Sequence, residues 1–268
     1  MRGAFVGGTP TRPTRRCYTV LAYIYEERRM RRLSLAIALI ASSASAFASG
    51  LSLNSIQNLN QQQFYELSQD LGAALSYKPL EPADPLGLSG FDLGVTVTAT
   101  SLVNTSALEI ASSNNSVYST LPQPGIRAVK GLPYNIDIGA MFSKVPDSSI
   151  NVFGGELKWA VLPGGIALPA VALRATITRL NGVGQLDFET IGADVSVSKE
   201  FLVATPYIGT GEVWSRDSTD GLPLSQVNLS QYKLFGGVSF KLGPTNLVLE
   251  ADSTGGIHSF SLLAGFRF

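Results

Sequence analysis

The 268-residue sequence has little cysteine, histidine or charge. It contains one cysteine and one histidine, and charged residues make up 15 % of the chain. A single cysteine excludes a disulfide scaffold and any multi-thiolate metal site, and a single histidine argues against a histidine-rich metal centre. The low charge and the 45 % of hydrophobic residues argue against a disordered chain. The formal net charge of +0 gives no electrostatic case for nucleic-acid binding.

The sequence also lacks an apolar run long enough for a transmembrane helix, which needs about 20 residues. This excludes a helical membrane protein. Residues 30–48 instead predict a secretory signal peptide, with Arg31 and Arg32 ahead of a short apolar core at 33–41. Ala46 and Ala48 form an A-x-A cleavage site, which predicts a mature N-terminus at Ser49.

Residues 1–29 precede this signal peptide and are rich in arginine, with no apolar period. We expect them to be a misannotated extension, with translation starting at Met30; an unusually long basic leader is the alternative. Removing residues 1–48 takes away eight arginines, two glutamates and Cys17, which leaves 12 basic and 18 acidic residues and a formal charge of −6. An exported chain without cysteine cannot use disulfides, so a large core or closure of its backbone hydrogen bonds must stabilise it.

The predicted mature chain falls into two parts. Residues 49–70 are rich in Asn and Gln and carry a loose helical stripe, which predicts a periplasmic lead-in or short helix that lies at a barrel mouth, plugs the lumen or forms a mobile terminus. From Leu71 the apolar period becomes two, and residues 71–268 are expected to form one β domain. Ten segments of strand pattern are predicted: 71–79, 90–101, 134–144, 150–161, 169–180, 186–198, 202–214, 231–241, 245–252 and 258–268.

Alternation alone does not show which face meets which solvent, because a soluble sandwich buries its apolar face and a membrane barrel turns it toward lipid. Segment length favours the barrel, since a tilted strand needs about ten residues to cross a bilayer. Aromatic residues also recur eight positions apart on the apolar face, as an aromatic girdle at each interface requires. The pairs are Tyr134 with Phe142, Tyr232 with Phe240, and Phe260 with Phe268.

The chain ends in Gly265-Phe266-Arg267-Phe268, with both phenylalanines on one strand face. Together with the signal peptide and the strand pattern, this resembles outer-membrane β-barrel proteins of Gram-negative bacteria. The resemblance implies an all-β, antiparallel up-and-down transmembrane barrel in the bacterial outer membrane, in contact with lipid. It also implies that the barrel-assembly machinery recognises the last strand, with Phe266 and Phe268 as the assembly signal. Residues 70–78 and 130–134 look like a poorly characterised outer-membrane family, from which no function can be transferred.

An even strand count returns both barrel ends to the periplasm. The short turns at Gly243-Pro244 and Lys199-Glu200 then lie on the periplasmic side, and the loop at 215–230 lies outside. The long Asn/Ser-rich stretch at 102–133 does not fit this count. It is expected either to hide two further strands, such as 125–132, or to fold into the lumen, so that twelve strands is the alternative to ten.

Charged residues opposite the apolar face are candidates for lining the lumen. They are expected to pair across a narrow interior and fill it, or else to line a polar conduit or a small ligand site. The candidates are Asp92, Asp137, Glu156, Lys158, Arg174, Asp194, Lys233, Lys241, Glu250 and Arg267.

Three functions remain open at this stage. The first is an integral outer-membrane barrel that acts as a small channel or transporter or as a structural envelope protein. The second is an outer-membrane enzyme that uses His258 with nearby Ser259, Ser261 and Asp252. Neighbouring residues in a strand point to opposite faces, so His258 and Ser259 are poorly placed for a hydrogen bond. We therefore expect no catalysis and no cofactor. The third is a secreted soluble β-sandwich or adhesin. The oligomeric state stays open.

Overall fold

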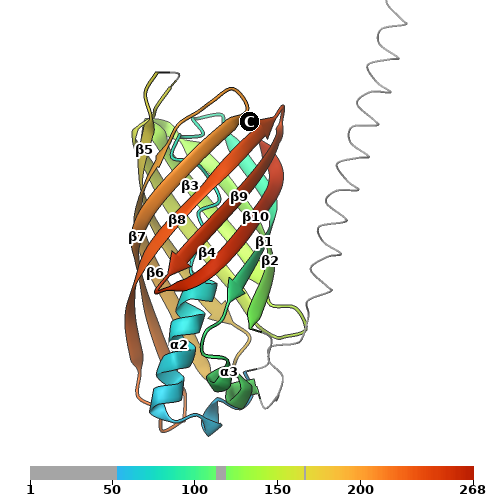
Figure 1. The fold of residues 1–268 in the computed structure, drawn as a ribbon, viewed down its shortest axis with the longest axis vertical. Coiled ribbons are helices and arrows are strands. Elements are labelled where there is room, and N and C mark those ends of the chain that lie inside the picture. The colour runs from blue at the N-terminus through green and yellow to red at the C-terminus, as the bar shows by residue number, and fades with distance from the viewer. Residues whose placement is uncertain (1–52, 113–118, 166) are drawn as a thin grey trace, which may run out of the picture. The chain divides into compact units, whose positions relative to one another are not determined.

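The computed structural model describes residues 53–112, 119–165 and 167–268, so that residues 1–29, the signal peptide at 30–48 and its cleavage site at Ala46 and Ala48 lie outside the described residues. Ten antiparallel strands close into a barrel (Figure 1), in which β1 pairs with both β2 and β10. The strands are β1 (Phe91–Ser101), β2 (Thr120–Leu132), β3 (Ile136–Lys144), β4 (Asn151–Leu162), β5 (Ala170–Asn181), β6 (Leu186–Ser198), β7 (Ala204–Thr219), β8 (Val227–Leu242), β9 (Thr245–Thr254) and β10 (Ile257–Arg267). The expected fold class and the count of ten strands are confirmed.

Closure satisfies the backbone without a free sheet edge. β1 and β10 pair from Asp92↔Arg267 to Thr100↔Ser259, and Phe91 and Phe268 exchange two backbone hydrogen bonds of 3.2 and 3.0 Å. We call the end of the barrel where these two residues lie the terminal rim. The opposite end, the capped rim, is covered by the short helices η2 (Ile56–Asn58) and α3 (Thr105–Ser112) and by the start of α2 (Gln61–Leu75) (Figure 1).

The apolar face of the strands points outward. Leu93 in β1, Ile138 in β3 and Leu157 in β4 have exposed fractions of 46, 50 and 51 %, whereas Asp92, Asp137 and Glu156 beside them in the chain are buried. A soluble sandwich would bury the first three residues between its sheets. In the described part of the chain, no helix has both the length and the apolar character needed to cross a membrane.

The segment at 71–79 is not a strand, which corrects the first predicted element. Residues 61–75 form the helix α2, which lies inside the barrel and contacts strands β7 to β10. Asn60 and Gln63 form a capping box, in which each side chain accepts a hydrogen bond from the other residue's backbone N–H, at 2.9 and 3.0 Å. The cap fixes where the helix begins, and burial on all sides of its last turn hides the helical period at Leu71–Leu75.

The region 102–133 contains one further strand, β2, and the loop before it carries α3. The structure therefore replaces the predicted strand 71–79 with β2, and the twelve-strand alternative is wrong. Pro122 and Pro124 made this strand hard to recognise, because proline is depleted in central strands. They lie where β2 extends beyond β3, since β2 pairs with β3 only from Gly125↔Ser143 onward.

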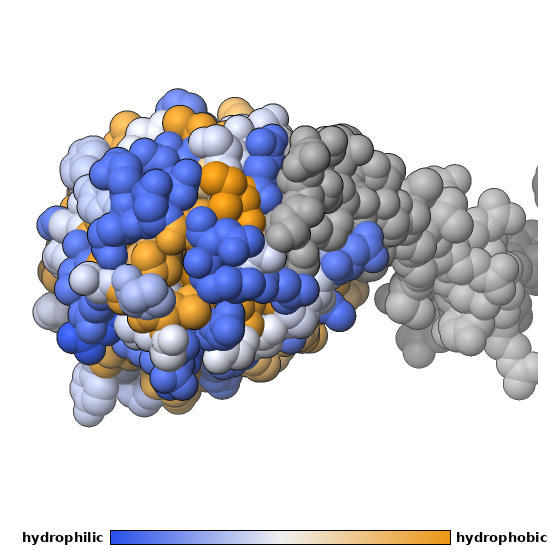
Figure 2. Space-filling model, turned by 90° about the horizontal axis from the view of Figure 1, so that it is seen from below, coloured by the Kyte–Doolittle hydropathy of each residue, from blue (hydrophilic) through white to orange (hydrophobic). Residues whose placement is uncertain are grey.

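The barrel interior is apolar toward the capped rim. There, α2, α3 and η2 pack against inward-facing residues of the wall such as Val152, Leu180 and Phe188. Seen from this end, apolar side chains lie in the middle of the surface with hydrophilic ones around them (Figure 2). Apolar side chains therefore fill much of this half of the lumen, where α2 plugs it as one of the expectations for the N-terminal segment had it.

Candidate functional site: the lumen strap

After α2 the chain continues as an irregular, bent segment through the barrel toward the terminal rim (Figure 1). We call residues 76–90 the lumen strap. Tyr77, Leu80, Glu81 and Ala83 have exposed fractions of 0 to 2 %, so that the wall encloses this part of the strap, whereas Leu88 near the terminal rim is exposed. Within the strap the N–H of Gly90 donates to the carbonyl of Gly87 at 3.0 Å, and the buried polar groups depend on the wall for partners.

The strap contains three consecutive triplets that each begin with proline: Pro79-Leu80-Glu81, Pro82-Ala83-Asp84 and Pro85-Leu86-Gly87. Each proline removes one backbone N–H that would otherwise need a partner. Leu80 has a φ of 49°, in the left-handed region, so the strap is not a polyproline II helix. The triplets therefore reduce the number of donors that the lumen must satisfy.

The second residue of every triplet donates its backbone N–H to a side chain of the wall. The acceptors are Glu250 Oε2 for Leu80 (2.8 Å), Ser198 Oγ for Ala83 (3.1 Å) and both Asp137 carboxylate oxygens for Leu86 (3.2 Å each). These acceptors come from β9, β6 and β3. The wall therefore binds each of the three triplets through one side-chain acceptor, and each acceptor comes from a different strand.

The third residue of the first triplet, Glu81, is the central anion of the lumen. Its carboxylate lies 3.1 Å from Lys158 Nζ, 3.0 Å from Arg127 Nη2 and 3.8 Å from Arg174 Nη2, and all four side chains have exposed fractions of 0 to 2 %. A buried carboxylate needs such partners, because removing its charge from water costs several kcal/mol. Glu81 therefore joins three strands of the wall through a single side chain.

The third residue of the second triplet, Asp84, pairs with Arg267 in β10 at 2.9 Å. Around the same level, Lys158 donates hydrogen bonds to the backbone carbonyls of Pro82 and Asp84, each at 3.2 Å, and pairs with Asp137 at 3.0 Å. Lys158 thus satisfies both the backbone and the side chains of the strap, which explains why its ammonium group is fully buried.

A second polar cluster lies where α2 ends. Lys78 pairs with Asp252 at 3.0 Å and donates to the carbonyl of Ala73 at 2.9 Å. Lys233 donates to the carbonyl of Tyr77 at 2.5 Å. The cavity against this part of the strap measures about 20 Å³, enough for roughly one water molecule. The strap and its partners therefore fill this section of the lumen.

The loop after β1 is tied to α2 near the capped rim. The Asp70 carboxylate accepts hydrogen bonds from the backbone N–H of Asn104 at 2.8 Å and from its side-chain amide at 3.2 Å. The helix and the loop are thus held as one unit.

Nine of the ten candidate lumen residues point inward, in two groups. Arg174 lies 3.5 Å from Glu156 and 3.9 Å from Asp194, and Lys241 lies at the terminal rim, half-exposed and paired with Glu200. The strap and its surroundings contain Asp92, Asp137, Glu156, Lys158, Arg174, Asp194 and Arg267, and the cluster next to α2 contains Lys233 and Glu250.

Sequence reasoning missed several residues of the site. Arg127 lies in the unrecognised strand β2, and Lys78, Glu81 and Asp84 lie in the strap, outside any strand. Asp252 could have been found, because it lies two residues from Glu250 and therefore faces the same side of β9.

His258 and its proposed partners lie on two sides of the wall. In register, His258 is opposite Ser253 on the outward side, while Asp252 and Ser259 are opposite each other on the inward side. The Asp252 carboxylate is bound to Lys78. The residues described do not bring a carboxylate and His258 together, and within them no group of three potential ligand side chains could hold a metal ion.

Phe266 and Phe268 lie on the outward face, with exposed fractions of 38 and 68 %. Their assignment as an assembly signal stays a prediction.

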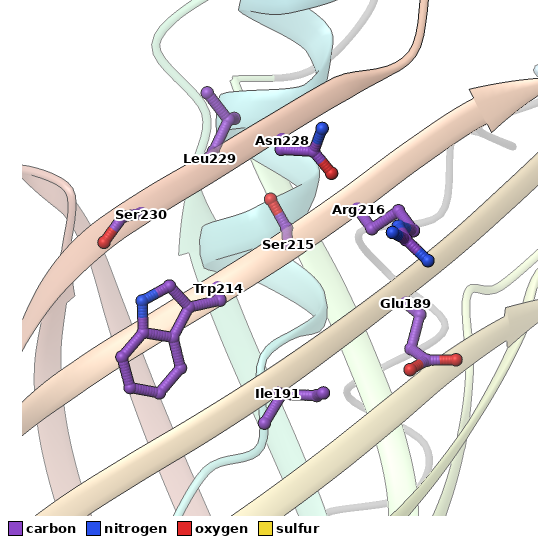
Figure 3. Close-up of a pocket in the computed structure, with 8 residues that line it drawn as sticks. All are labelled: Glu189, Ile191, Trp214, Ser215, Arg216, Asn228, Leu229 and Ser230. Carbon is purple, nitrogen blue, oxygen red and sulfur yellow. The ribbon is translucent and has the colours of Figure 1, made fainter.

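The outer wall has a recess of about 500 Å³ over β6, β7 and β8, lined by Glu189, Ile191, Trp214, Ser215, Arg216, Asn228, Leu229 and Ser230 (Figure 3). Arg216 and Glu189 are register partners at one end of it, and Trp214 and Ile191 are register partners nearer the middle of the barrel. The change from apolar to charged side chains marks where the apolar band ends toward the capped rim, with a tryptophan at the boundary.

No protein-family model and no curated protein matches the chain. Among solved structures it is similar to the N-terminal β-barrel domain of Pseudomonas aeruginosa OprF (10 % identity, TM-score 0.32, covering 68 % of this chain and 99 % of that one). It is also similar to Neisserial surface protein A (12 %, 0.26, 67 and 96 %) and to the translocator domain of the autotransporter NalP from Neisseria meningitidis (11 %, 0.33, 78 and 95 %). At these TM-scores the assignment of the fold rests on the closed barrel itself.

Proposed function

We propose that this protein is an integral outer-membrane barrel with a structural role in the envelope, whose lumen is closed by its own N-terminal segment. The outward apolar band supports the membrane location, because half-exposed residues such as Leu93, Ile138 and Leu157 would be unfavourable in water. A closed sheet also satisfies every strand hydrogen bond internally, which lipid demands.

The single observation that carries the closed state is Glu81, which is fully buried inside the barrel and bound to cations from β2, β4 and β5. An open channel would need this carboxylate and the three triplets of the strap to leave the lumen together. That movement would leave buried charges without partners, at a cost of about 3–5 kcal/mol for one broken pair.

Conductance of the purified protein in planar lipid bilayers tests the proposal. Folding and insertion are checked first, by the shift in gel migration on boiling and by protection from added protease. We expect the folded, inserted protein to show no steps above the lipid background. A variant that lacks residues 53–86 removes η2, α2 and most of the strap and should conduct if it folds. Regular conductance steps from the unmodified protein would show that it is a channel and would overturn the closed-barrel proposal.

A further inference from the structure

The segment before β1 passes through the whole length of the barrel. At the capped rim, the side chain of Gln61 exchanges two hydrogen bonds with the backbone of Ser225 in the loop after β7, at 2.8 and 3.1 Å. At the terminal rim, Lys130 Nζ donates to the carbonyls of Leu88 and Gly90, at 2.7 and 3.0 Å. The helical part of this segment and the start of β1 therefore lie at opposite ends of the barrel.

The two rims can be assigned to the two sides of the membrane. This assignment rests on the proposed function as an outer-membrane barrel. Outer-membrane barrels have short periplasmic turns and longer extracellular loops. The longest connection, residues 102–119 with α3, lies at the capped rim, whereas the connections at the terminal rim are 133–135, 163–169, 199–203 and 243–244, none longer than seven residues. The other connections at the capped rim are of similar length, so the assignment depends on 102–119. The capped rim is then extracellular and the terminal rim periplasmic.

We propose that residues 53–63, with η2 and the start of α2, are displayed on the cell surface and reach it from within the barrel, although β1 begins on the periplasmic side. The barrel wall thus anchors and presents its own N-terminal segment.

Closure of the wall fixes when this crossing happens. β1 pairs with β10 along nearly its whole length, and the strap fills the lumen that this pairing closes. Threading after closure would require the helix α2 to pass lengthwise through a barrel that is already closed, so the N-terminal segment crosses while β1 and β10 are still apart. Residues 53–64 contain no charged side chain, so they can pass the charged lumen residues without forming ion pairs.

Cysteine labelling on whole cells tests this topology, in full-length variants that also carry Cys17→Ser. The two variants at the capped rim are Gln57→Cys in η2 and Asp220→Cys in the loop after β7; the two at the terminal rim are Leu88→Cys in the strap and Leu202→Cys in the turn after β6. All four positions are exposed. The probe is a maleimide that does not cross the outer membrane, applied to intact and to permeabilised cells.

We expect the cysteines at positions 57 and 220 to react in intact cells and those at 88 and 202 to react only after permeabilisation. Labelling at 220 without labelling at 57, although 57 reacts once the cells are permeabilised, would overturn surface display and leave the membrane barrel intact. Labelling at 88 and 202 alone in intact cells would reverse the orientation and overturn the proposal. If none of the four reacts until permeabilisation, the outer-membrane location itself is wrong.

Discussion

The carboxylate of Glu81 lies 3.1 Å from the ammonium group of Lys158, and both side chains are completely buried. The two residues are far apart in sequence, and only closure of the wall around the strap brings them together. Arg127 binds the other carboxylate oxygen of Glu81. The strap and the wall therefore depend on each other, because removing either member of an ion pair leaves the other charge buried without it.

Replacing Glu81 should destabilise the barrel strongly. We expect Glu81→Gln to lower the free energy of unfolding by about 3–5 kcal/mol, since it leaves three buried cations without their shared anion. Urea unfolding in phospholipid micelles, followed by the fluorescence of Trp159 and Trp214, measures this. Glu200→Gln is the matched control, because its ion pair with Lys241 is solvent-exposed, and it should cost about 0–1 kcal/mol. Equal effects of the two variants would contradict the central role of Glu81.

The hydroxyl of Tyr207 donates a hydrogen bond of 2.7 Å to the Glu250 oxygen that also accepts the N–H of Leu80. Tyr207→Phe should lower stability by about 1.5–3 kcal/mol, the range for hydrogen bonds to charged groups. Tyr134→Phe changes the same hydroxyl at an exposed turn position and should have almost no effect. The same unfolding measurement applies, and an unchanged midpoint for Tyr207→Phe would show that the strap does not depend on this bond.

A charge on the outer wall should distinguish a lipid-facing surface from a water-facing one. Leu157→Arg places a cation in the apolar band and should cost about 2–4 kcal/mol if that position faces the membrane core. Leu202→Arg, at a fully exposed turn, should fold normally. Refolding yield into lipid vesicles, read from the gel shift, gives the comparison. A Leu157→Arg protein that folds as well as its control would argue for a soluble protein.

Loss of the capping box should destabilise α2 more than the strands of the wall. Asn60→Ala removes the acceptor for the Gln63 N–H and should destabilise the helix by about 0.5–2 kcal/mol. Hydrogen exchange should therefore increase in residues 61–75 and stay unchanged in β3 and β4. Gln57→Ala, in the exposed part of η2, is the control and should leave the exchange of α2 as it was. Faster hydrogen exchange in all strands of the wall would show that α2 and the wall unfold together.

The sequence was most informative where one residue type alternated with another. The outward side chains of β1, β4, β5 and β10 follow from the period of two, because each strand has one face toward lipid and one toward the lumen. The same alternation placed Asp92, Glu156 and Arg174 inside the barrel. In contrast, Glu81 and Asp84 gave no periodic signal, because the strap is bent and has no fixed inner and outer face. Lys78 lay in the segment 71–79 that was wrongly predicted to be a strand.

The sequence by itself determined that the chain forms long amphipathic strands, since alternation is a local property of neighbouring residues. Only the tertiary structure decided that residues 71–75 end a helix, that β2 completes the wall despite its prolines, and that the strap fills the lumen. These outcomes depend on contacts between residues far apart in sequence, such as Glu81 with Arg174 and Lys78 with Asp252. These ion pairs stabilise the fold only once the sheet has closed, because closure removes the water that would otherwise solvate each charge.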